Sequence, residues 1–125
     1  MRTFEEKYLI EHNFHFDTCI HLDAEIIKGS VIHCYETLDM IDQNLISKNS
    51  TKLSSLIELA NLSSIIGNLL GAGCAEYSHG FYLRNKPHVY PDLIATDSTL
   101  SGIEIKTALL RNSPKGHHPK PGYYL

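Results

Sequence analysis

At 125 residues, the chain has the length of one domain with a single hydrophobic core. Its composition, 42% hydrophobic and 20% charged, is that of an ordinary soluble globular protein. No apolar run approaches the roughly 18 residues of a membrane span, and the acidic N-terminus lacks the pattern of a signal peptide, so we expect a cytoplasmic protein without membrane contact. The three cysteines form no CxxC pair, which argues against a zinc knuckle and a disulfide framework.

The net charge of −3 is unevenly distributed along the chain. Residues 1–78 carry five Lys and Arg against eleven Asp and Glu, whereas residues 79–125 carry six against three. A basic second half would let one face of the protein meet a polyanion while the acidic half keeps it soluble.

Two long helices are predicted in the first 75 residues. Apolar residues recur at steps of three and four over about residues 16–47, a spacing that Gly29 and Ser30 can divide into two helices. A polar connection leads to a second helix over about residues 52–75. This second helix contains three glycines, each of which costs up to about 1 kcal/mol relative to alanine. They indicate close backbone packing or a helix that frays towards its end.

The pattern becomes extended after residue 80. Strands are expected over residues 81–84, 89–96 and 102–110, separated by turn-rich segments. Asp97 falls in the second of these segments and is expected to form a turn. The last residues, 123–125, look like the beginning of another strand, so we expect the chain to be a truncated or excised part of a longer protein.

Charged residues interrupt two of these apolar strands. A period of two in the last strand places Ile103 and Ile105 on one face and Glu104 and Lys106 on the other. If the preceding strand pairs antiparallel with it, Asp92 at the start of that strand lies near the same place. Two carboxylates and one ammonium group would then converge.

Such a group of side chains has a chemical interpretation and a structural one. Two carboxylates suit a hard cation such as Mg²⁺, which can stabilise charge on a phosphodiester and lower the pKa of an attacking water. The adjacent lysine can orient that water. The same residues can equally form a structural salt bridge in a twisted hairpin.

A family resemblance favours the chemical interpretation. Pro91 and Asp92, followed after eleven residues by Glu104, Ile105 and Lys106, resemble the PD-(D/E)xK motif of the restriction-endonuclease-like nuclease superfamily. The resemblance implies an α/β (α+β) fold, with N-terminal helices followed by a mixed β-sheet core flanked by helices, incomplete if the chain is truncated. It also implies that Asp92 and Glu104 bind Mg²⁺, that the Ile105 carbonyl is a further metal ligand, and that Lys106 is the catalytic lysine.

The resemblance covers about residues 53–125. It therefore divides the chain into an N-terminal helical region, residues 1–50, and a partial nuclease core, residues 51–125, within one folded unit. Members of the family often add an acid from the preceding helix, and Glu58 and Glu76 are both candidates. We prefer Glu76 because it is closer to the strands in the sequence.

Basic and polar loops flank the predicted strands and could contact DNA. The candidate DNA-binding residues are Arg84, Lys86, Arg111, Lys115, His117 and His118.

The resemblance implies a Mg²⁺-dependent endonuclease that hydrolyses double-stranded DNA, most like a Type II restriction enzyme that acts as a homodimer. A nuclease of DNA repair or junction resolution is a close variant. A different alternative is a non-catalytic nucleic-acid-binding or assembly domain, in which Glu104 and Lys106 form a structural pair.

Overall fold

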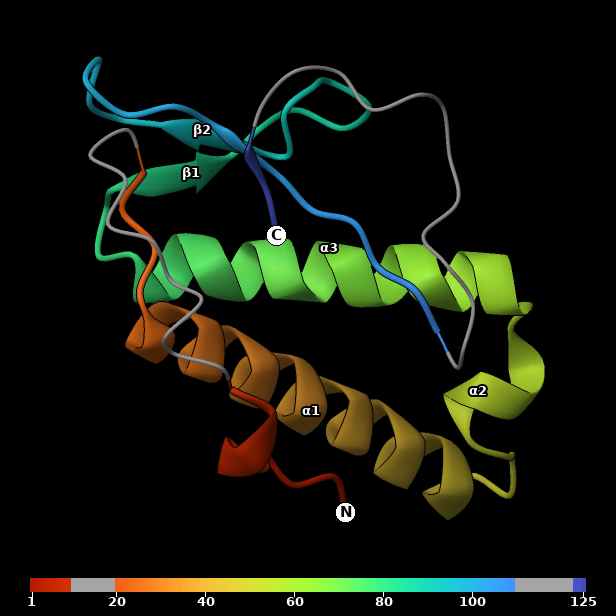
Figure 1. Ribbon diagram of the computed structural model, residues 1–125. Helices are drawn as coiled ribbons and strands as arrows, with labels where there is room; N and C mark the ends of the chain where they lie inside the picture. Colours follow the sequence, from red (N-terminus) through yellow and green to blue (C-terminus); the bar gives the residue numbers. More distant parts are fainter. Residues whose placement is uncertain (10–19, 110–122) are drawn as a thin grey trace.

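The computed structural model describes residues 1–9, 20–109 and 123–125 (Figure 1). A short 3-10 helix, Glu6–Tyr8, precedes three α-helices, which are α1 (Ala24–Ser47), α2 (Leu53–Leu56) and α3 (Leu59–Tyr77). Four short strands follow: β1 (Tyr82–Arg84), β2 (Leu93–Ala95), β3 (Ile103–Glu104) and β4 (Tyr123–Tyr124). No helix in the described ranges is long and apolar enough to cross a membrane.

Helix α1 begins later than the apolar spacing predicts. The Asp23 side chain accepts a hydrogen bond from the backbone N–H of Ile26 and caps the helix, while residues 20–23 are not helical. The division that Gly29 and Ser30 would allow does not occur, because α1 continues through both residues. The Ser30 hydroxyl donates to the Ile26 carbonyl one turn earlier and so stays within the helix.

The predicted second helix is in fact two helices. Ile57 and Glu58 have extended backbones and separate α2 from α3, so that Glu58 is the N-cap residue of α3. A contact from α1 holds the start of α2: one carboxylate oxygen of Asp42 accepts from the Leu53 N–H at 2.8 Å. The other oxygen accepts from Arg2 at 2.9 Å. These hydrogen bonds hold the pKa of the Asp42 carboxyl below its ordinary value, and the bond from the Leu53 N–H has the largest effect.

Figure 1 shows α3 between α1 and the strands. Glycines permit close contacts on both sides of α3. A Cβ atom on Gly73 would lie 2.8 Å from the Ser30 Cα in α1, and one on Gly71 would lie 3.3 Å from the Ile105 Cδ1 beyond β3. The close backbone packing predicted from these glycines is therefore confirmed.

The strands form one sheet in the order β1-β2-β3-β4. The first three are antiparallel, with Leu83 opposite Ile94 and Leu93 opposite Ile103, and β4 runs parallel to β3. The predicted antiparallel pairing of the second and third strands is confirmed, as is the mixed α+β class of helices followed by a sheet. The regular strands are much shorter than the predicted ranges.

The inner face of the sheet packs against the helices. Tyr82, Leu93 and Ile103 are almost completely buried, each at 1% exposure or less. The Tyr82 hydroxyl accepts a hydrogen bond from the His21 N–H at 2.8 Å, which satisfies its polar atom inside the core. The remaining members of this cluster are Ile26, Cys74 and Ile105.

The glycine contacts give a stability prediction. Replacing Gly73 by alanine should lower the free energy of unfolding by about 1–3 kcal/mol, because the new methyl group would overlap the Ser30 backbone. Urea denaturation with linear extrapolation measures this change.

Gly67→Ala is the matched control. Its new methyl group would meet only the Thr107 side chain, at 3.7 Å, an ordinary contact distance. The better helix propensity of alanine should then leave stability unchanged or raise it by up to about 1 kcal/mol. Equal destabilisation by both alanines would contradict the packing described for α3.

Candidate active site

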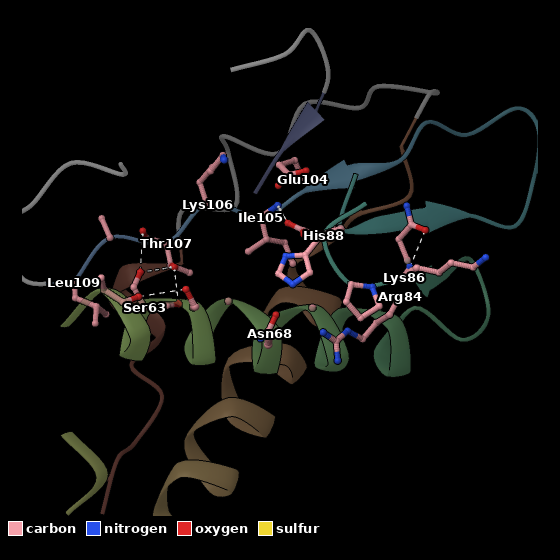
Figure 2. Close-up of a pocket in the computed structure, with 18 of the residues that line it drawn as sticks. Ser63, Asn68, Arg84, Lys86, His88, Glu104, Ile105, Lys106, Thr107 and Leu109 are labelled. Atoms are coloured by element: carbon pink, nitrogen blue, oxygen red, sulfur yellow. Dashed lines mark hydrogen bonds between the residues drawn. The ribbon is translucent and has the colours of Figure 1, made fainter. Parts of the chain in front are cut away.

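A cavity of about 1050 Å³ lies between α3 and two segments of the sheet region. One segment, residues 84–88, begins at the end of β1, and the other, residues 104–109, begins in β3; both continue beyond their strands. Figure 2 shows the side chains that line this cavity. Asp92, Glu104, Ile105 and Lys106, the four residues of the motif with a predicted role, all belong to the lining.

The pairing of β2 with β3 brings Asp92 and Glu104 together. Asp92 comes directly before β2, and Glu104 ends β3. The Asp92 Oδ2 accepts a hydrogen bond from the Ile105 N–H at 2.8 Å, so its carboxylate is fixed beside the neighbouring segment. The structure therefore brings the two predicted carboxylates to one place.

Asn85 and Gly102 hold the backbone around Asp92. The Asn85 N–H donates to the Asp92 carbonyl at 2.9 Å, and the Asn85 side-chain amide donates to the Pro91 carbonyl, also at 2.9 Å. On the other side, a Cβ atom on Gly102 would lie 2.5 Å from the Pro91 Cγ and 2.6 Å from the Leu93 carbonyl oxygen. Only glycine fits here without a shift of the backbone, which explains how β3 approaches Asp92 so closely.

Glu104 is in an environment that disfavours its charge. Burial raises the pKa of the Glu104 carboxyl, and the hydrogen bond and negative charge of Asp92 raise it further, against the opposing effect of Lys106. The Glu104 Oε2 is buried and has no hydrogen-bond partner within the described part of the chain. An unpartnered buried carboxylate oxygen beside a second carboxylate is an arrangement that a cation would stabilise.

Lys106 does not form the salt bridge that the structural alternative requires. Its side chain is exposed, and among the described residues it lies within 4.0 Å of no carboxylate. Figure 2 shows Glu104 and Lys106 on the side of β3 that faces away from α3. The backbones of both residues are hydrogen-bonded to Leu125, which follows β4: the Lys106 N–H donates to the Leu125 carbonyl, and the Leu125 N–H donates to the Glu104 carbonyl.

Neither helix glutamate lines the cavity. Glu58 precedes α3 as its N-cap residue, so it lies just outside the helix that was expected to supply the acid. Glu76 lies at the other end of α3, where its carboxylate is 3.9 Å from the Nδ1 of His33 in α1. Within residues 1–9, 20–109 and 123–125, no three His, Cys, Asp or Glu side chains are placed to hold a metal ion together. The acidic groups at the site are therefore Asp92 and Glu104.

Two of the predicted DNA-binding residues line the cavity. The Arg84 side chain lies close to α3: its Nε is 3.9 Å from the position that a Cβ atom on Gly71 would occupy. Figure 2 shows that Lys86 points away from Glu104. The other four, Arg111, Lys115, His117 and His118, lie outside the described residues.

The structure adds two polar residues that the motif did not predict. Asn68 projects from α3 towards the cavity, and the His88 imidazole lies between it and Ile105 (Figure 2). Asn68 lies beside Gly67 and three residues before Gly71 on one helix face, a spacing that could have identified it. His88 has a positive φ of 61°, an unusual backbone conformation for a residue other than glycine, and the sequence gives no signal for it.

Comparison with models of protein families, with curated proteins and with solved structures found no match to this chain.

The raised pKa of Glu104 gives a prediction about stability and pH. The folded protein keeps the Glu104 proton at pH values where the unfolded chain has lost it. The free energy of unfolding should therefore fall as the pH rises above the ordinary glutamate pKa of about 4.3. Mg²⁺ should oppose this loss at neutral pH if it binds the folded state. Urea denaturation at several pH values, with and without Mg²⁺, measures both effects.

The Glu104→Gln variant should lose this pH dependence and the response to Mg²⁺. Glu58→Gln and Glu76→Gln make the same chemical change outside the cavity and should retain both. An unchanged pH slope in Glu104→Gln, or a Mg²⁺ response that depends on Glu76, would contradict this description of the site.

Proposed function

We propose that this protein is a Mg²⁺-dependent nuclease of the PD-(D/E)xK type that hydrolyses phosphodiester bonds in double-stranded DNA. The observation that carries the proposal is the convergence of Asp92 and Glu104, where a buried Glu104 oxygen has no partner within the described residues. A purely structural carboxylate pair would be unfavourable here, because two like charges disfavour each other and the Glu104 carboxylate loses hydration.

The residues at the site fit a hard divalent cation. Asp92 and Glu104 supply carboxylate oxygens, and the Ile105 backbone adjoins both. Mg²⁺ commonly uses one or two protein carboxylates and takes its other ligands from water and substrate phosphate, so a third acidic residue is not required. When bound, the ion would supply charge stabilisation for the phosphodiester and lower the pKa of an attacking water.

The protein itself would orient the reacting groups. Lys106 follows the carboxylate pair and carries an ammonium group free of any ion pair among the described residues, so it is available to position a water and offset developing negative charge. Arg84 reaches the cavity from β1 and can hold a substrate phosphate through its planar guanidinium group. Asp92 would stay in place during the reaction because backbone groups hold it.

The order of elements supports the same family. A helix, α3, precedes three antiparallel strands, Asp92 comes directly before the second strand, and Glu104 ends the third. This is the helix, strand and hairpin order that the resemblance requires. A Type II restriction enzyme that acts as a homodimer, with one site for each DNA strand, is the form of this function that we propose.

Cleavage of supercoiled plasmid DNA tests the proposal. The protein should cut in Mg²⁺ and not in EDTA. The isosteric variants Asp92→Asn and Glu104→Gln should each reduce the rate by about 100-fold or more, because each removes a ligand charge. Lys106→Met should have an effect of similar size through loss of its positive charge.

Asp97→Asn is the matched control. Asp97 belongs to the same stretch of sequence, but its carboxylate accepts hydrogen bonds from the Thr99 backbone and hydroxyl in an exposed turn, as predicted. Asparagine can accept the same hydrogen bonds, so cutting should be unchanged. Cutting that persists in EDTA, or in all three site variants, would refute the nuclease proposal and favour a non-catalytic domain.

A further inference from the structure

Three side chains with hydrogen-bond donors line the α3 side of the cavity. Asn68 comes from α3, Arg84 ends β1, and His88 belongs to the segment that follows β1. Figure 2 shows the His88 imidazole directed towards Asn68, and the Arg84 guanidinium group beside α3. Within the described part of the chain, none of the three side chains makes a hydrogen bond or an ion pair. We call these three residues the donor cluster.

The donor cluster has the composition of a phosphate site. All three residues are exposed, so a ligand can reach them. The guanidinium group supplies a positive charge and several N–H donors, and the amide and the imidazole each add at least one donor. Arginine, asparagine and other N–H donors are the groups that proteins commonly use to hold the phosphates of nucleic acids.

The backbone at His88 indicates that its side chain is present for a function. The Val89 N–H donates to the Lys86 carbonyl at 3.2 Å, so Pro87 and His88 are the central residues of a β-turn. With a φ of 61°, His88 occupies the position that usually belongs to glycine in a type II turn. A side chain there imposes a cost on the fold that glycine would avoid. Residues strained in this way concentrate at sites that bind a ligand.

The donor cluster and the acid pair lie on different sides of β3. Figure 2 shows Glu104 on the side of β3 that faces away from α3, whereas Asn68 and His88 lie on the α3 side. One cavity is nevertheless lined by both groups. A phosphate bound by the donor cluster is therefore a different one from the phosphodiester at the acid pair. A DNA strand carries a phosphate at every nucleotide, so a neighbouring phosphate is available.

We propose that Asn68, Arg84 and His88 bind a backbone phosphate of DNA, next to the phosphodiester that lies at Asp92 and Glu104. This inference rests on the proposed function, because it takes the bound polyanion to be DNA. A phosphate contact fixes the position of a strand but carries no sequence information of its own. The donor cluster would thus determine how the strand enters the site, and other residues would read the bases.

Replacing His88 by glycine separates DNA binding from folding. Because glycine adopts a positive φ at little cost, His88→Gly should raise the melting temperature by roughly 3–6 °C. The same change should weaken DNA binding about tenfold, because it removes a hydrogen bond to a charged group. Fluorescence anisotropy measures the affinity for two duplexes of equal length and unrelated sequence, with Ca²⁺ in place of Mg²⁺ and at constant salt.

His79→Gly is the matched control. His79 also has a positive φ, of 52°, and is exposed, but it does not line the cavity. Its replacement by glycine should raise the melting temperature in the same way and leave both affinities unchanged.

The other two donors have their own variants and controls. Arg84→Gln should make the dependence of log K on log salt less steep by about one, because one phosphate contact is lost. Lys48→Gln removes a positive charge at the end of α1, outside the cavity, and should keep the slope. Asn68→Ala should weaken binding to both duplexes, whereas Asn61→Ala, which lies on the same helix but outside the cavity, should not.

The outcomes separate this inference from the nuclease proposal. Unchanged affinity in His88→Gly would overturn the phosphate site even if plasmid DNA is cut. An affinity loss for only one of the two sequences, which indicates base contact, or a loss accompanied by a lower melting temperature, would overturn it as well. So would the absence of binding to either duplex by the parent protein. Weaker binding of both duplexes by His88→Gly, together with no Mg²⁺-dependent cutting by the parent protein, would refute the nuclease proposal and support the donor cluster as the phosphate site of a non-catalytic domain.

Discussion

The close approach of α1 and α3 is the constraint on which the rest of the structure depends. Gly73 meets the Ser30 backbone, and a Cβ atom on Gly29 would lie 2.5 Å from the Tyr77 ring, so side chains cannot be added on either helix at these contacts. With α3 fixed in this way, its opposite face supports the sheet through Gly71 and Ile105. The positions of the two carboxylates are thus set by packing that begins on the far side of α3.

The candidate site differs from the rest of the described structure in the pairing of its buried polar atoms. Elsewhere the buried polar groups have partners: Asp42 binds Leu53 and Arg2, and the Tyr82 hydroxyl accepts from His21. Glu104 alone among the described residues retains a buried side-chain oxygen without one. Such local exceptions concentrate at functional sites, because a ligand can compensate what the fold leaves unpaired.

The hairpin could be predicted from the sequence, whereas the helix boundaries and the surroundings of the carboxylates could not. Alternation of Ile103 and Ile105 with charged residues determines which face is buried, and a short turn determines the antiparallel pairing. The start of α2 is held by a long-range contact, that of Asp42 with the Leu53 N–H, and apolar spacing does not record such contacts. Glu58 and Glu76 were candidates because the resembled family often adds an acid from the helix before the strands, and the sequence does not show that neither of them lines the cavity.

The hydrogen bonds that hold Asp92 come from main-chain groups, the N–H of Ile105 to its carboxylate and the N–H of Asn85 to its carbonyl. Every residue other than proline can supply such a donor. Replacing a neighbouring side chain therefore leaves these two donors in place, except at Asn85, whose side chain also holds Pro91, and at Gly102, where only glycine fits. The same scaffold could acquire new substrate preferences through changes along the face of α3 that lines the cavity, while its acid pair stays in place.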